Sequence, residues 1–181
     1  ANDQLRELQN EFNQLREGYH QSPPSPYTRA ADVRAYRSGA PLWALCDFGS
    51  DVPATDRASI EAALEASGLL DAWITPDGRL LSQNEHDTIL VVGTSEQAPA
   101  GRSLDAVLKP SIDKQDQRTG AVSEGTVRSV LRHIGFGANV NTVWVDASGR
   151  WQLGPLHGTW NKPTAQHIGH AADAAAFDAD L

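Results

Sequence analysis

The chain has 181 residues, of which 40% are hydrophobic, so it can bury one sizeable core, and one domain of ordinary size is expected. A net charge of −8 and a pI near 5.1 work against sequence-independent nucleic-acid binding by the whole chain, because phosphate contacts need clustered Lys and Arg. No apolar run approaches the ~20 residues that span a bilayer, no signal-peptide layout is present, and the single Cys46 cannot form an internal disulfide. We therefore expect a cytoplasmic protein without a membrane partner.

The first segment has the pattern of a coiled-coil helix. Apolar residues recur at spacings of three and four among polar ones, which is an a/d seam. The seam residues are Leu5, Leu8, Phe12, Leu15 and Tyr19. So narrow an apolar stripe is marginal on a lone helix in water, so the seam needs a partner helix. We expect residues 1–20 to form an outgoing coiled-coil arm; an amphipathic helix lying on the domain's own core is the alternative.

A proline-rich break separates this arm from a globular body expected over residues 27–160. Pro23, Pro24 and Pro26 remove backbone donors and force the preceding residues to be extended. After the break, "PLWALCDFG" (41–49) is typical of an apolar strand or buried segment. The next run predicts a helix capped near Thr55 and stopped by Gly68.

The middle of the body predicts short strands and helices. "DAWITPDGRLLS" (71–82) predicts a β-hairpin, because a Pro-Asp-Gly turn separates two apolar runs. The apolar, β-branched run 87–93 predicts a buried strand. A short helix is expected from Ser103 to Pro110, followed by a polar loop over 112–122.

The last part of the body predicts a helix and a second hairpin. "SEGTVRSVLRHIGFG" has a Ser123 cap, helical apolar spacing and Gly135 as its stop. "NTVWVDASGRWQLG" (141–154) predicts a hairpin. A final helix is expected to start at Asn161 or Thr164, so that residues 161–181 form a returning arm. Its seam residues would be Ile168, Ala172 and Ala175.

Strand and helix signals alternate, and hairpins outnumber parallel crossovers. The predicted class is therefore α+β, with a mixed or antiparallel sheet, packed helices, and terminal helices that form a short antiparallel coiled-coil stub.

No catalytic or cofactor-binding pattern stands out. The chain has no Gly-Lys pair, so it lacks a phosphate-binding loop, and "GFGAN" (135–139) follows a helix rather than a strand. His167 and His170, three residues apart on the expected helix, are a superficial metal-binding pair, with His157 upstream in the loop. Zinc hydrolysis needs a third ligand and a general base, and no H-E-x-x-H is present, so solvated or capping histidines are the favoured interpretation. We expect no metal, no cofactor and no enzymatic activity of this chain alone.

The charged residues leave two alternatives open. Four aspartates near strand ends could converge on a catalytic site, although exposed carboxylates are favoured; they are Asp47, Asp71, Asp87 and Asp146. A small stand-alone enzyme with a His/Asp site in the 146–170 loop is therefore one alternative. A DNA-contacting module that uses Arg128 and Arg132 is another; a solvated face is favoured for these two and for Arg29, Arg34 and Arg37.

Several stretches resemble one protein family. They are "GAPLWALCDF", "ATDRASIEAALEASGLLDAWITPDGRLL", "VSEGTVRSVLRHIGFG" and "GRWQLGPLHGTWNKPTAQHIGHAA". Together they resemble the middle domain of large bacterial SMC-like coiled-coil ATPases, the motor subunits of Wadjet (Jet) plasmid-defence systems, which are related to the MukB type of condensin. The resemblance covers roughly residues 39–172.

The resemblance implies that the chain is a hinge with stubs of both coiled-coil arms. In this family the ATPase head forms from the far ends of the polypeptide and the hinge homodimerises, while the whole complex, with its other subunits, binds and extrudes DNA. The missing phosphate-binding loop fits this, because that motif would lie outside the fragment. Two features depart from the pattern: the returning segment "HAADAAAFDADL" is alanine-rich and acidic, and no Cys-x-x-Cys is present for a zinc-hook apex.

Dimerisation would then depend on packed protein surface. Gly135, Phe136 and Gly137 are the candidate dimer interface, because a Gly-rich turn allows close backbone approach and an exposed strand edge there could pair across a two-fold axis.

Overall fold

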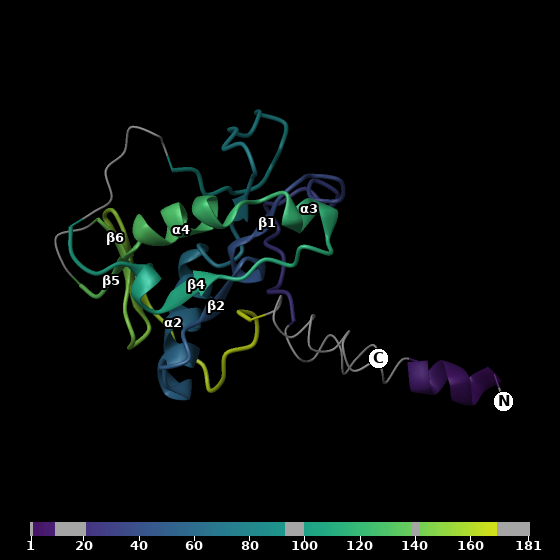
Figure 1. Cartoon of the computed structure of the whole chain (residues 1–181), viewed down its shortest axis with the longest axis horizontal. Helices are drawn as coiled ribbons and strands as arrows, with labels where there is room; N and C mark the ends of the chain where they lie inside the picture. The colour runs from purple at the N-terminus through teal and green to yellow at the C-terminus, as the bar shows by residue number, and fades with distance from the viewer. Residues whose placement is uncertain (1, 10–20, 93–99, 139–141, 170–181) are drawn as a thin grey trace.

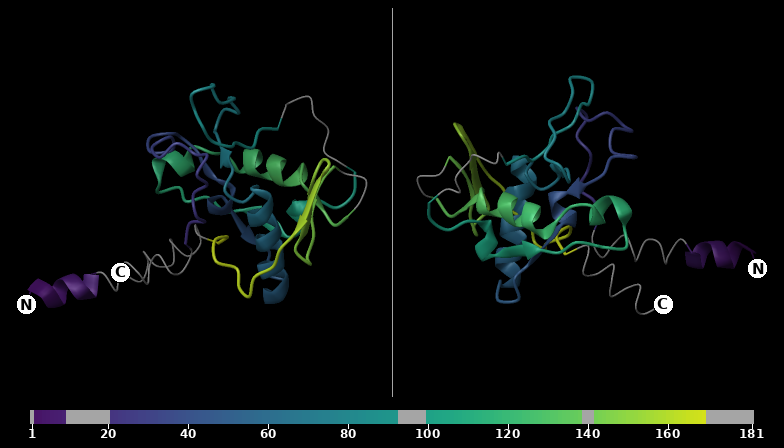
Figure 2. Two further views of the ribbon diagram at one scale, coloured as in Figure 1. Left: turned by 180° about the vertical axis from the view of Figure 1, so that it is seen from behind. Right: turned by 45° about the horizontal axis from the view of Figure 1, so that its top comes forward.

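A computed structural model describes residues 2–9, 21–92, 100–138 and 142–169, and it has the predicted α+β class. Residues 2–9 form an exposed helix that lies apart from the body, while two principal helices, α2 and α4, pack among small sheets within it (Figure 1). A four-stranded sheet lies at the end of the body opposite the 28–37 loop, as Figure 2 also shows.

The central helix α2 (Ala54–Ser67) is buried over its middle residues, 58–64, and it confirms the helix predicted there. The cap predicted near Thr55 is wrong, because the helix starts at Ala54 with Pro53 as its N-cap. Its run of Ala and Leu favours helix, and the extended Pro53 precedes it. It ends where Gly68 adopts φ 86°, a left-handed conformation that glycine accepts without a Cβ penalty. The four-stranded sheet packs along it.

Two small antiparallel pairs form the middle of the body. The first joins β1 (Ala40–Pro41) to β3 (Trp73–Ile74), and the second joins β2 (Cys46–Phe48) to β4 (Leu108–Pro110). A 3₁₀ turn, η1 (Leu42–Ala44), links β1 to β2. All three η1 residues are buried, so this apolar stretch forms the centre of the core, as predicted for 41–49.

The first predicted hairpin is wrong. The Pro-Asp-Gly turn is present, with Gly78 at φ 67°, but residues 79–81 form no strand after it. Instead, β3 pairs with β1, and a single parallel bridge joins Trp73 to Ile89. A buried strand was predicted over 87–93. Its described residues form no strand, only an extended segment with the one bridge at Ile89.

Helix α4 (Glu124–Arg132) confirms both the predicted helix and its cap, because the Ser123 side chain accepts the Thr126 N–H at 3.1 Å. The predicted stop at Gly135 is wrong: the helix ends at Arg132 with His133 as its C-cap, and Gly135 begins strand β5. Upstream, the helix predicted from Ser103 to Pro110 is only the turn η2 (Leu104–Ala106) followed by β4. The short helix α3 (Gln117–Gly120) lies in the stretch expected to be loop.

The four-stranded sheet runs β5-β6-β7-β8, with β5 parallel to β6 and the other pairs antiparallel. Its strands are β5 (Gly135–Phe136), β6 (Val143–Val145), β7 (Arg150–Leu153) and β8 (Leu156–Thr159). The predicted second hairpin is confirmed as β6 and β7, and the sheet is mixed, as expected. β8 is an additional strand.

The body extends beyond residue 160. Residues 161–169 are not helical, so the helix expected to start at Asn161 or Thr164 does not begin there. Ile168 lies in the hydrophobic core, packed with the body rather than in a coiled-coil seam.

Candidate functional site

The chain enters and leaves the body at the same place. The Gln21 N–H donates to the Gln166 carbonyl at 3.1 Å, and the His167 ring, through Nδ1, contacts the Gln21 carbonyl. Pro23, the first proline of the predicted break, is buried directly after this contact. We call the region formed by Gln21, Glu61, Lys162 and residues 166–168 the junction.

One buried carboxylate organises the junction. Glu61 lies on α2 and is fully buried. It accepts backbone N–H groups from three consecutive residues: Gln166 at 2.6 Å, His167 at 2.8 Å and Ile168 at 2.7 Å. The Lys162 ammonium lies 2.6 Å from its Oε2. Burial alone would raise the pKa of Glu61, but the Ile168 N–H, the Lys162 side chain and the Gln166 N–H together hold that pKa below its usual range.

A second carboxylate one helical turn later completes this arrangement. Glu65 Oε1 lies 2.8 Å from Lys162 Nζ and 3.1 Å from His167 Nε2. The Lys162 side chain is almost wholly buried between the two glutamates. The segment that leaves the body is therefore fixed to α2 by charged hydrogen bonds, and through His167 it is also fixed to the segment that enters.

Three arginines anchor the chain that follows the junction. Arg29, Arg34 and Arg37 surround the Asp87 carboxylate at 2.8–2.9 Å, and Arg29 also reaches Asp71 at 2.6 Å. Burial would raise the pKa of Asp87, but bonds from Arg34, the Thr88 N–H and Arg37 lower it far below the ordinary range.

The prediction of a solvated arginine face here is therefore wrong. Trp73 adds to the network, because the Arg34 guanidinium lies 5.0 Å from the centre of its ring. Asp71 and Asp87 do converge, as the catalytic alternative requires, but both carboxylates are neutralised by arginines, so the pair anchors the 28–37 loop.

The candidate dimer residues do not lie on an open strand edge. The outer side of β5 is bridged by residues 102–104: the Phe136 N–H donates to the Arg102 carbonyl at 2.9 Å, and Ser103 pairs with Gly135. Gly135 is buried, while Gly137 has φ 100° and open space around its Cβ position. The expectation of an exposed edge at this place is wrong, although the role of these three residues in dimerisation stays a prediction.

The candidate DNA contacts lie on the exposed side of α4. Arg128 is exposed and takes part in none of the ion pairs among the described residues. Arg132 is exposed, with its Nε 3.4 Å from Asp105 Oδ2. One of the two arginines is thus free and the other is partly neutralised, so few positive charges are available here to contact nucleic-acid phosphates.

The predicted coiled-coil seam is only partly described. Leu5 and Leu8 are exposed on the helix over residues 2–9. Ile168 belongs to the core instead. The other seam residues lie outside the described part of the chain; they are Phe12, Leu15, Ala172 and Ala175.

The described residues contain no cluster of side chains that could bind a metal ion. No set of three His, Cys, Asp or Glu side chains in residues 2–9, 21–92, 100–138 and 142–169 could hold an ion. His157 is exposed on β8, His167 is buried with its ring against the Gln21 carbonyl, and His170 lies outside the described residues. Asp146 is occupied by its own turn, where it accepts N–H groups from Ser148 and Arg150.

Cys46 behaves as predicted for a small buried thiol. It is fully buried, and burial, with smaller contributions from Asp47 and Glu61, raises its pKa. A thiol in this state is a poor nucleophile at neutral pH.

The junction is what the sequence analysis missed. Its signal is a glutamate inside an otherwise apolar helical stretch, "SIEAAL", where α2 has no exposed face to receive it. A buried carboxylate needs a partner, and Lys162 supplies one about a hundred residues later.

No known protein family, curated protein or solved structure matches this chain. Within the described part of the chain, no helix combines the length and apolarity required to traverse a bilayer.

Proposed function

We propose that this chain is the hinge and dimerisation domain of an SMC-like coiled-coil ATPase of the Wadjet plasmid-defence type, and that it has no catalytic activity of its own. The observation that carries the proposal is the junction, where Gln21 and Gln166 are joined by a backbone hydrogen bond. A domain interpolated between an outgoing and a returning arm must bring its two ends together in this way. Domains with ends far apart cannot be inserted into a helical hairpin without opening it.

The bonding at the junction fits a mechanical role. Glu61 and Glu65 tie the leaving segment to the central helix, and His167 ties it to the entering segment. A pulling force on either arm would therefore be transmitted to α2, which packs along the four-stranded sheet. In the proposed complex, ATP hydrolysis at distant heads would act on the hinge through these arms, and the closed hinge would complete a ring around DNA together with the other subunits.

The free edge of β8 is the surface that best supports homodimerisation. β8 is the last strand of its sheet, and no described residue pairs with its outer edge. Because the Trp160 N–H donates to Gly149, the alternation of an antiparallel ladder directs the backbone groups of His157 and Thr159 outward. The strand carries no charged residue, and charges are the usual protection of an exposed edge.

The side chains around this edge are self-complementary. Leu156 is 57% exposed and Trp160 is 44% exposed, and the two flank Gly158 on one face of the strand. A two-fold axis through Gly158 would place Leu156 opposite Trp160 of a second copy, and His157 opposite Thr159. This register pairs the outward backbone groups and buries both apolar side chains, as an isologous interface requires.

Light scattering over a concentration series tests the dimer, and two lysine substitutions test its surface. We expect the wild-type chain to be a dimer, Leu156→Lys to weaken dimerisation at least tenfold, and Tyr36→Lys, at a side chain 96% exposed on the opposite loop, to leave it unchanged. A wild-type monomer at all concentrations would overturn the dimerising hinge. A dimer equally insensitive to both substitutions would overturn only the assignment of β8.

The interpolated arms have a separate test. If the segments that flank the junction continue as paired antiparallel helices, Phe12 and Ala175, which are the same number of residues from the Gln21–Gln166 hydrogen bond, should come close to each other. A Phe12→Cys/Ala175→Cys variant should then form a disulfide rapidly, because Cys46 is buried and does not compete. A Phe12→Cys/Tyr36→Cys variant is the control. Equal disulfide formation in both variants, or none in either, would contradict the paired arms.

A further inference from the structure

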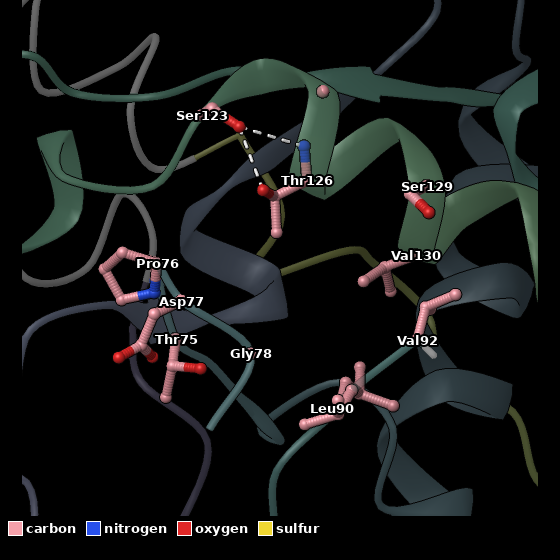
Figure 3. A pocket seen from close by; sticks show the side chains of 12 residues that line it. Thr75, Pro76, Asp77, Gly78, Leu90, Val92, Ser123, Thr126, Ser129 and Val130 are labelled. Atoms are coloured by element: carbon pink, nitrogen blue, oxygen red, sulfur yellow. Dashed lines mark hydrogen bonds between the residues drawn. The ribbon is translucent and has the colours of Figure 1, made fainter. Parts of the chain in front are cut away.

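A cleft of about 430 Å³ lies between α4 and the chain around β3, away from the junction and from β8. One wall is the N-terminal part of α4; the other is the turn Pro76–Gly78 with the extended residues Leu90–Val92 (Figure 3). Its volume is within the range of small-molecule sites. Four hydroxyl groups line it, from Thr75, Ser123, Thr126 and Ser129.

The N-terminus of α4 presents unused donors to this cleft. Ser123 accepts the Thr126 N–H, and its carbonyl accepts the Val127 N–H. The N–H groups of Glu124 and Gly125 precede the first bonds within the helix, so they have no helical acceptor. Gly125 lines the cleft, and its N–H lies where the helix dipole is positive. A single negative charge would be stabilised here.

A second, independent feature is the side chain of Thr75. The residue is only 3% exposed, and its hydroxyl oxygen has no hydrogen-bond partner. Figure 3 shows Thr75 among the lining side chains, on the wall across from Thr126, with its oxygen toward the cleft. Buried hydroxyl groups are nearly always hydrogen-bonded, so an unpaired one that faces a cavity indicates a missing partner.

The remaining lining residues define the body of the ligand. Leu90, Val92 and Val130 form an aliphatic surface between the two polar places. No Lys or Arg lines the cleft, which disfavours a multiply charged phosphate. Asp77 is engaged in its own turn, where it accepts the Arg79 N–H at 3.2 Å.

We propose that this cleft binds a small oxo-carboxylic acid. The carboxylate accepts hydrogen bonds from the Gly125 N–H and from one hydroxyl group at the N-terminus of α4, because Ser123 Oγ and Thr126 Oγ1 lie 2.9 Å apart and the other hydroxyl donates within that pair. The short aliphatic body lies on Leu90, Val92 and Val130. The carbonyl oxygen accepts the hydrogen bond of the otherwise unpaired Thr75 hydroxyl. The proposal is independent of the hinge function.

An NMR titration that follows individual backbone amide signals can test the carboxylate contact and the Thr75 contact one at a time, with three nearly isosteric probes. They are 4-oxopentanoate, 4-methylpentanoate, which replaces the carbonyl oxygen by a methyl group, and 4-oxopentanamide, which has a neutral head. We expect 4-oxopentanoate to shift the Gly125 and Thr126 amide signals saturably. The methyl isostere should bind roughly five- to tenfold more weakly, because one hydrogen bond is lost, and the amide should bind more weakly still.

Variants of Thr75 complete the test. In Thr75→Val the two acids should bind equally, while Thr75→Ser, which keeps the hydroxyl, should retain the preference for 4-oxopentanoate. Thr88→Val is the control, because this exposed threonine lies just before the lining residues Leu90–Val92 but does not line the cleft itself. The absence of saturable shifts with every probe, equal binding of the amide, or a preference that survives Thr75→Val would each overturn the proposal.

Discussion

Replacing Glu61 by Gln tests the central claim about the junction. The substitution keeps the shape of the side chain but removes its charge, and one of its two oxygens becomes an NH₂ group. The carboxylate now accepts three backbone N–H groups and faces the Lys162 ammonium. A glutamine has only one acceptor oxygen, so its NH₂ group must face either another N–H or the ammonium.

The expected cost follows from burial. Glu61 is fully buried and the Lys162 side chain is 6% exposed, so water cannot replace the lost interactions. Removing one partner of a buried ion pair costs about 3–5 kcal/mol. Lys162 keeps its contact with Glu65, but the glutamine also leaves buried backbone N–H groups without an acceptor. Glu61→Gln should lower the free energy of unfolding by an amount in this range, measured by urea denaturation followed through tryptophan fluorescence. Trp43, whose ring centroid lies 6.5 Å from that of His167, places one reporter near the junction.

A double variant distinguishes lost charge pairing from lost packing. Glu61→Gln/Lys162→Met removes both charges, and it should recover part of the stability that Glu61→Gln loses. The matched control is Glu124→Gln, which changes an exposed glutamate in the first turn of α4. A loss below about 1 kcal/mol for Glu61→Gln, or a double variant less stable than the single one, would show that the buried charge pair does not stabilise the junction.

The same side chain predicts a pH dependence with a definite sign. The pKa of Glu61 is lowered in the folded protein, so the unfolded chain binds the proton more readily. This stabilisation is fully present above the unfolded value of about 4.3 and is lost as the pH falls toward the folded pKa. Between pH 6 and pH 3, roughly, wild type should therefore lose more stability than Glu61→Gln. Parallel curves for the two proteins would contradict the assignment.

Four other substitutions have definite outcomes. Asp87→Asn should destabilise the protein by about 3 kcal/mol and speed proteolysis of the 28–37 loop, because it leaves three arginines around a neutral group; unchanged proteolysis would contradict the anchoring role. Gly158→Ala should lower the melting temperature, because a Cβ there would overlap the Trp151 ring. Gly154→Ala is the control: its Cβ position is open, so the substitution should cost only the backbone strain of its positive φ, about 1 kcal/mol. Arg128→Glu should abolish any retention of duplex DNA at ~150 mM salt, and no retention by wild type would exclude the DNA-contacting alternative.

Elements whose signals are local were predictable from the sequence. The Ser123 cap and the spacing of Val127, Val130 and Leu131 define α4 within one short window. The β6–β7 hairpin likewise needs only its own turn, where Gly149 has φ 93°. In both cases the residues that decide the structure are neighbours in the chain.

Partner choice between distant segments was not predictable. The Pro-Asp-Gly turn formed as expected, yet Trp73 pairs with Pro41 and bridges to Ile89, because these segments complete the core while Leu80 remains exposed. Ile168 fits a helical apolar period as well as it fits a core position, and only the contacts made through Glu61 decide between them. Long-range electrostatic pairing leaves little trace in a single sequence.

The junction also means that the body can be removed from the chain, or inserted into another one, as a single unit. Since one hydrogen bond separates Gln21 from Gln166, everything between them spans almost no distance in whatever surrounds it. A turn of a few residues could replace the whole body and leave the flanking chain in place. By the same geometry, the body could be inserted into a surface loop of an unrelated protein without stretching that loop, and the hydrogen bonds to Glu61 would hold the two ends of the insertion together.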